Sequence, residues 1–228
     1  MACMPLRLAA ICGLVAPLTY LVGLVFGGLA QPDEFSSADD AISDLGAKTA
    51  SNPWIYNQVG LNITGSLIVV FAVGLWLALS PSVLGRLGAL AVALTGLTLF
   101  LQGFFRLDCR GIDAGCENDS WVTDGHRLFT GISAAFLFAA PLLLAFAFRR
   151  LPGWRRAWLP SLLAIPVFVA ASVLFSLIGD GASNRAGAIA WFVWLAFIAF
   201  LLLQEARRAA RTAFDSSSQP LTRSRRGD

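Results

Sequence analysis

Charged residues are scarce in this sequence. Of its 228 residues, 14% are Asp, Glu, Lys or Arg and 57% are hydrophobic, whereas charged residues make up about a quarter of an ordinary soluble domain. Histidine occurs once and cysteine four times. One histidine supplies few nitrogen ligands, and the cysteines lack the close pairing of zinc sites. The composition therefore excludes an ordinary soluble domain, and we expect neither a metal nor another cofactor.

Long uncharged runs account for most of the hydrophobic residues. A helix needs about 20 apolar residues to cross the hydrocarbon core of a membrane. Six runs without Asp, Glu, Lys, Arg or His meet this length: 8–30, 59–79, 87–105, 128–148, 159–179 and 186–204. Backbone groups within lipid must be satisfied inside the protein, which favours helices. The sequence predicts an all-α fold, a bundle of six transmembrane helices forming one domain over 1–206.

Basic residues are distributed unevenly between the ends of these runs. Twelve fall at one end, counting Arg7, Arg86, the group at 149–156 and the tail, and five fall at the other. Because basic residues collect on the cytoplasmic side, we predict cytoplasmic termini, outward-facing segments 31–58 and 106–127, and a location in a bacterial inner membrane. We expect the basic end to contact anionic lipid headgroups rather than nucleic acid. The basic segment 207–228 is predicted to be a disordered cytoplasmic tail.

Two cysteines, Cys109 and Cys116, lie in the second of these outward segments. Outside the cytoplasm such a pair favours a disulfide, which would close a small ring and hold the segment in one shape. A metal site is the alternative for these thiols. The sequence predicts the disulfide.

Polar residues at the outward ends of the runs are the candidates for chemistry. Asp108 follows the third run and His126 precedes the fourth, so they could form an acid–base pair. The alternative for His126 is a capping role at a helix start. Ser43 would complete a Ser/His/Asp set, although no nucleophile-elbow motif surrounds it. Asn62, near the outer end of the second run, could bind a ligand or join two helices by a hydrogen bond. The runs carry no ionisable residue at mid-membrane depth, which disfavours a proton-driven transporter.

Several short motifs point to a known family. They are "ISDLGA" at 42–47, "NPWIYNQVGLNITG" at 52–65, "FRLDC" at 105–109, "GH" at 125–126 and "SNRAG" at 183–187. With them the sequence resembles the prokaryotic integral membrane proteins of the domain of unknown function (DUF) 998 family. The Ser-Asp-x-Gly loop is more distantly similar to that of the Frag1/DRAM/Sfk1 membrane proteins, which are linked to lipid homeostasis.

The resemblance implies that Ser43, Asp44, Asp108, His126 and Arg185 lie at the outer ends of different spans. Together they could form a polar pocket for a phosphate, a lipid headgroup or a small zwitterion. Alternatively, Asp44 and Arg185 could form a buried ion pair that holds the first outer segment on the bundle.

The sequence therefore predicts a protein that binds or modifies a lipid or other small amphiphile at an outward-facing pocket. If it is an enzyme, His126 would act as general acid or base, Asp108 would orient it, and Arg185 with Asp44 and Asn62 would hold the ligand. A scaffold for another membrane protein or a homo-oligomer is the alternative, and a small-molecule transporter is the third possibility.

Overall fold

The computed structural model describes residues 3–217, and all the regular secondary structure over that range is helical. Its six long helices are α1 (Cys3–Leu29), α2 (Thr64–Ala78), α3 (Val83–Gln102), α4 (Trp121–Arg150), α5 (Trp158–Ser176) and α6 (Asp180–Ser217). Three short helical segments join them: η1 (Ile42–Gly46), η2 (Ile55–Ile63) and η3 (Pro152–Ala157). Six helical stretches are long and apolar enough to cross a membrane. The predicted all-α, six-helix architecture is confirmed, and the chain is a multi-pass membrane protein.

Each membrane-spanning stretch begins earlier than the apolar run that predicted it, and the second does so when η2 is counted with α2. α4 starts at Trp121, where the hydroxyl of Ser120 accepts a hydrogen bond from the Thr123 amide at 3.3 Å. A side-chain cap of this kind fixes a helix start whatever the hydropathy of the first turn. His126 therefore lies inside α4, and Arg185 likewise lies inside α6.

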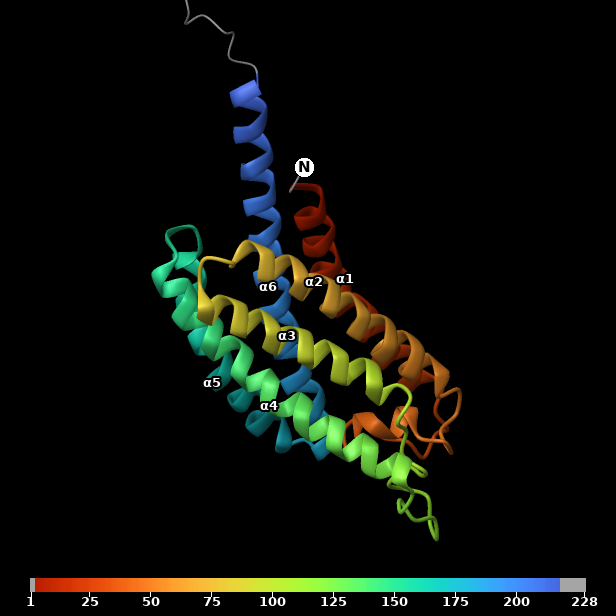
Figure 1. The fold of residues 1–228 in the computed structure, drawn as a ribbon. Helices are drawn as coiled ribbons and strands as arrows, with labels where there is room; N and C mark the ends of the chain where they lie inside the picture. Colours follow the sequence, from red (N-terminus) through yellow and green to blue (C-terminus); the bar gives the residue numbers. More distant parts are fainter. Residues whose placement is uncertain (1–2, 218–228) are drawn as a thin grey trace, which may run out of the picture.

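The predicted disordered tail needs correction over its first half. α6 continues as a helix to Ser217 and projects beyond the rest of the bundle (Figure 1). Alanines, which favour helices, and an ion pair between Arg208 and Glu205 at 2.8 Å accompany this extension. The remainder of the predicted tail, 218–228, lies outside the described residues.

The six helices form a ring. Each long helix packs against the next one in the chain, and α6 packs against α1 to close the circle. Figure 1 shows the N-terminal end of α1 and the C-terminal end of α6 at the same end of the bundle. The opposite end is formed by residues 30–54, 103–120 and 177–179, which we call the loop face.

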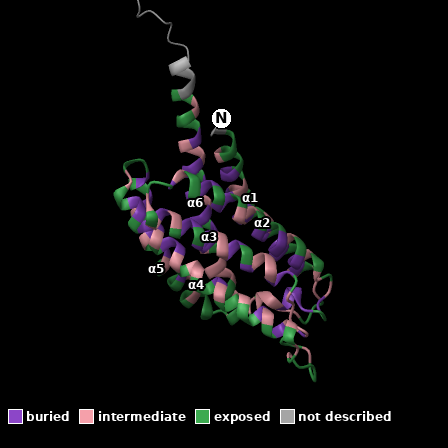
Figure 2. Ribbon diagram, viewed as in Figure 1, coloured by how far each residue is buried: buried purple, intermediate pink, exposed green. Residues whose placement is uncertain are grey.

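Buried and exposed residues alternate along the helices of the ring (Figure 2). The exposed ones include many large apolar side chains. Phe71 and Trp191 are among the largest fully buried side chains. Leu174 and Leu177, near the loop-face end of α5, are 63% and 84% exposed. Such apolar exposure suits a surface that faces lipid.

Close packing between α1 and η2 depends on glycine. A Cβ on Gly23 would overlap the backbone Cα and N atoms of Gly60. Small residues of this kind let membrane helices approach closely. The contact brings Tyr20 of α1 and Tyr56 of η2 together, with their ring centroids 6.5 Å apart.

Candidate functional site

The loop face is a layer of three interlocked segments. The Asn57 side chain of η2 donates to the Gly46 carbonyl at 2.9 Å and so fixes η1. The Lys48 amide donates to the Leu107 carbonyl at 2.9 Å and joins this layer to the hairpin between α3 and α4. η1, which carries Ser43 and Asp44, is therefore held in one position across the end of the ring.

The hairpin between α3 and α4 carries the disulfide. Cys109 and Cys116 are joined, with their Cα atoms 6.1 Å apart. The Asn118 side chain bonds to the Cys109 amide at 3.0 Å and to its carbonyl at 3.1 Å. Next to the disulfide, Arg110 and Thr49 both bond to Asp113, and they lower the pKa of that carboxyl to about 2. The disulfide-closed loop is therefore held by Asn118 at its start and is bonded to the first loop through Thr49.

Asp108 holds the hairpin in place and does not orient His126. Its carboxylate accepts from Lys48 at 2.5 Å, from the Ser120 amide at 3.1 Å and from the Thr123 hydroxyl at 2.9 Å. Lys48, followed by the bonds from Ser120, holds the pKa of Asp108 well below its usual range. The predicted acid–base pair between Asp108 and His126 does not form, because donors from Lys48, Ser120 and Thr123 occupy both carboxylate oxygens. Asp108 is instead an ionised residue that holds the hairpin to its neighbours.

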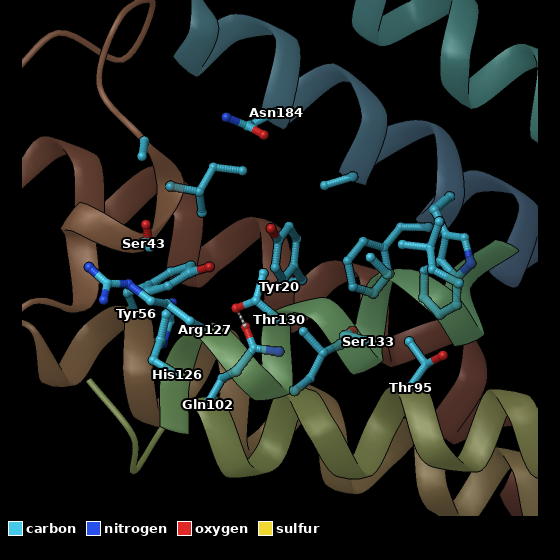
Figure 3. Close-up of a pocket in the computed structure, with 18 of the residues that line it drawn as sticks. Tyr20, Ser43, Tyr56, Thr95, Gln102, His126, Arg127, Thr130, Ser133 and Asn184 are labelled. Atoms are coloured by element: carbon cyan, nitrogen blue, oxygen red, sulfur yellow. Dashed lines mark hydrogen bonds between the residues drawn. The ribbon is translucent and has the colours of Figure 1, made fainter. Parts of the chain in front are cut away.

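A cavity of about 550 Å³ opens at the loop face and extends into the ring. Its walls come from η1, η2, α1, α3, α4 and α6, and the described residues that line it include none from α5. Figure 3 shows Ser43, Tyr56, His126 and Arg127 grouped toward one side of it, with Ser133 and Thr95 toward the other. Aliphatic and aromatic lining residues complete the wall: Leu99, Leu137, Ala188, Trp191 and Phe192.

His126 is a buried member of this wall, with 8% of its surface exposed. Its Nδ1 lies 2.8 Å from the Phe105 carbonyl oxygen. Because a carbonyl can only accept, Nδ1 carries a proton, and in the neutral ring Nε2 is the acceptor. The role that the sequence assigned to Asp108 is therefore filled by a backbone carbonyl.

Gln102, the last residue of α3, lines the cavity and carries a buried, unpaired donor. Its amide oxygen accepts from the Thr130 hydroxyl at 3.2 Å (Figure 3). Its Nε2 is buried without a hydrogen-bond partner among the described residues, and the residue is 7% exposed. The indole N–H of Trp191 is likewise buried and unpartnered. Buried donors without partners are uncommon and call for an explanation.

The other predicted site residues divide between the cavity and the scaffold. Ser43 lines the cavity. Arg185 donates to the Asp40 carbonyl at 2.8 Å and to the Gly181 carbonyl at 3.0 Å, so it fastens the first loop to α6 through backbone atoms rather than through an ion pair with Asp44. Asn62 donates to the Phe100 carbonyl at 2.6 Å, between η2 and α3, and does not line the cavity.

Asp44 belongs to an outer vestibule. A second cavity, of about 720 Å³, shares Ser43, Arg127 and Asn184 with the first. Asp44 is buried in its wall, and that burial raises the pKa of the carboxyl. Four aspartates and a single arginine line this vestibule: Asp39, Asp40, Asp44, Asp180 and Arg127. The entrance to the site is therefore acidic.

Sequence reasoning missed Tyr20, Tyr56, Gln102 and Trp191 as parts of one site. Each lies in or beside a hydrophobic run. In such a run an aromatic or amide side chain is most simply interpreted as a residue that packs between helices. The residues converge because the ring brings α1, α3 and α6 together at one end. Gln102 and Trp191 line the cavity and also carry buried N–H groups without a partner among the described residues, and this combination sets them apart.

Comparison with protein families places the chain. Residues 14–203 match the family model described as "Protein of unknown function (DUF998)", and this range includes part or all of each of the six helices and the whole loop face. Comparison with curated proteins and with solved structures finds no match. The matched range holds every residue of the cavity wall and contains the motifs that suggested the resemblance. The chain belongs to the DUF998 family.

Proposed function

We propose that this protein binds a membrane lipid or similar amphiphile in the loop-face cavity. The observation that carries the proposal is the division of the cavity wall. Ser43, His126 and Arg127 group toward one side (Figure 3), and most of the other lining residues are aliphatic or aromatic. Thr95 lies on the far side, but its hydroxyl donates to the Ala91 carbonyl of its own helix. An amphiphile matches this division because each of its ends finds a similar environment.

Access from the side favours a lipid over a water-soluble ligand. α4 and α6 both line the cavity, whereas α5, which packs against both of them, contributes no described residue to its wall. Ala134 lies near the middle of α4, where it both lines the cavity and is exposed. An opening at this depth faces the hydrocarbon of the membrane, from which a lipid chain can enter without crossing water.

The acidic vestibule favours a headgroup with a positive charge. Four aspartates against one arginine create a negative potential at the entrance, which attracts an ammonium group and repels an anionic one. We therefore assign the site to zwitterionic or cationic amphiphiles. This narrows the broader expectation of a phosphate, headgroup or zwitterion site.

A matched pair of substitutions tests lipid binding. Ala134→Trp places an indole in the cavity, whereas Ala135→Trp adds the same group at a neighbouring exposed position outside the lining. We expect Ala134→Trp to reduce the co-purifying zwitterionic lipid to about a tenth of the wild-type amount, measured by native mass spectrometry. Ala135→Trp should retain the wild-type amount. Equal lipid content in the two variants, or none in the wild type, would contradict the proposal.

We also propose that the loop face points away from the cytoplasm of a bacterial cell, with both termini inside. The support is the excess of basic residues at the opposite end of the bundle, together with a disulfide in the loop-face hairpin, since disulfides persist in oxidising compartments.

The single lysine of the chain provides a test of orientation. Lys48 lies at the loop face, and its side chain is 43% exposed. A membrane-impermeant amine reagent applied to cells with an intact cytoplasmic membrane should label the protein at this position. Lys48→Arg keeps the charge beside Asp108 and should abolish that labelling. If Lys48 reacts only after the membrane is opened, the orientation is reversed.

A further inference from the structure

We propose that the ligand is an ester-linked lipid whose acyl carbonyl accepts a hydrogen bond from the side-chain amide of Gln102. This inference rests on the proposed lipid-binding function and specifies the chemistry of the bound molecule.

One face of α4 gives the order of polarity along the cavity. His126, Thr130, Ser133 and Leu137 all line it, and they follow one another at helical spacing. At 1.5 Å per residue, Thr130 lies about 6 Å and Leu137 about 16 Å below His126 along the helix axis. This face of α4 thus changes from an imidazole, through two neutral hydroxyls, to an aliphatic side chain.

A glycerolipid has the same sequence of chemical groups. Its ionic headgroup is followed by neutral ester oxygens and then by hydrocarbon. The headgroup would lie beside the vestibule and His126, the ester at the level of Thr130, and the chain near Leu137. We therefore expect the ester at the level of the neutral hydroxyls of Thr130 and Ser133. Gln102 accepts its hydrogen bond from Thr130 at this same level.

Gln102 provides the specific contact. Its amide oxygen already accepts from Thr130, whereas its Nε2 has no partner among the described residues. Figure 3 shows this nitrogen on the Ser133 side of the amide, away from Thr130. An N–H at this position needs a neutral acceptor, because bringing an ionised group into an apolar interior is far more costly. An ester carbonyl meets that requirement, and an ether oxygen is a much weaker acceptor.

The test compares two lipids that differ only in this linkage. The purified full-length protein is exchanged into an equimolar mixture of diester and diether phosphatidylcholine with identical chain lengths, and the bound species are quantified by native mass spectrometry. We expect the wild type to retain the diester form about fivefold more than the diether form, the effect of one hydrogen bond. Gln102→Leu should bring the ratio close to one by losing diester lipid alone.

Thr98→Val is the matched control. Thr98 lies one turn from Gln102 on α3 and outside the cavity lining, and its hydroxyl bonds to carbonyls of its own helix. It should keep the wild-type preference. Equal retention of both lipids by the wild type would overturn the ester assignment while leaving lipid binding intact. A preference that persists in Gln102→Leu would overturn the role of that residue. Failure to retain either lipid would contradict the proposed function itself. If Gln102→Leu does not fold, the wild-type ratio alone decides the ester assignment.

Discussion

Gly23→Ala is expected to destabilise the bundle by about 2 kcal/mol, within the range measured for overpacked cores. The added methyl group would overlap backbone atoms of Gly60, which cannot rotate away as a flexible side chain can. α1 and η2 must therefore separate. That movement displaces Tyr20 and Tyr56 of the cavity wall, so the proposed lipid binding should also weaken.

Gly131→Ala is the control for this change. It is the same substitution in a membrane-spanning helix, but a Cβ at Gly131 meets no atom within 4 Å. Alanine favours a helix over glycine by up to about 1 kcal/mol, so this variant should be as stable as the wild type or slightly more stable. Thermal unfolding followed by size-exclusion chromatography in detergent measures both variants. Equal unfolding temperatures would show that the close approach of α1 and η2 is not needed.

Arg185→Gln is expected to release the first loop from α6. The guanidinium donates to the Asp40 carbonyl and lies over the Phe35 ring, with Cζ 5.9 Å from the ring centroid. Hydrogen bonds from a charged group contribute about 1.5–3 kcal/mol, so the population with the loop open should rise about 30-fold for a loss of 2 kcal/mol. Hydrogen–deuterium exchange of residues 36–47 in nanodiscs measures this population. Lipid retention should fall with it, because η1 carries Ser43 of the cavity wall.

Arg208→Gln removes an arginine at the opposite end of the bundle. Arg208 pairs with Glu205 on the projecting part of α6, and its side chain is 59% exposed. Exposed pairs contribute little to stability, so exchange at the loop face should not change. Unaltered exchange in Arg185→Gln would show that other contacts suffice to hold the loop, among them the bond from Asn57 to Gly46.

The sequence was sufficient to predict the six helices, because apolar length alone determines which segments can span a membrane. It was less informative about their ends. An uncharged run ends at the first charged residue, whereas the hydrogen bonding of a helix can continue through charged residues. α4 and α6 therefore begin before Leu128 and Ala186. The apolar pattern also did not predict that the second span begins at Ile55 with a π-helical segment.

The candidate site was predictable only in part. Ser43 and His126 line the cavity, as their polarity at the ends of the spans suggested. Asp108 and Arg185 have equally suggestive positions, but they bond to neighbouring segments of the loop face. Whether a charged side chain faces a ligand or a backbone carbonyl depends on packing between distant segments. A single sequence does not encode that choice in any local pattern.

The closed ring has a consequence for how the protein is made. α1 leaves the ribosome first and α6 last, yet these two helices pack against each other and both contribute to the cavity wall. One flank of α1 must therefore remain in contact with lipid while the other five helices are synthesised. Until α6 has been inserted, the nascent chain lacks one wall of the cavity. The proposed lipid site is therefore complete only at the end of translation, so lipid retention would report that membrane insertion is complete.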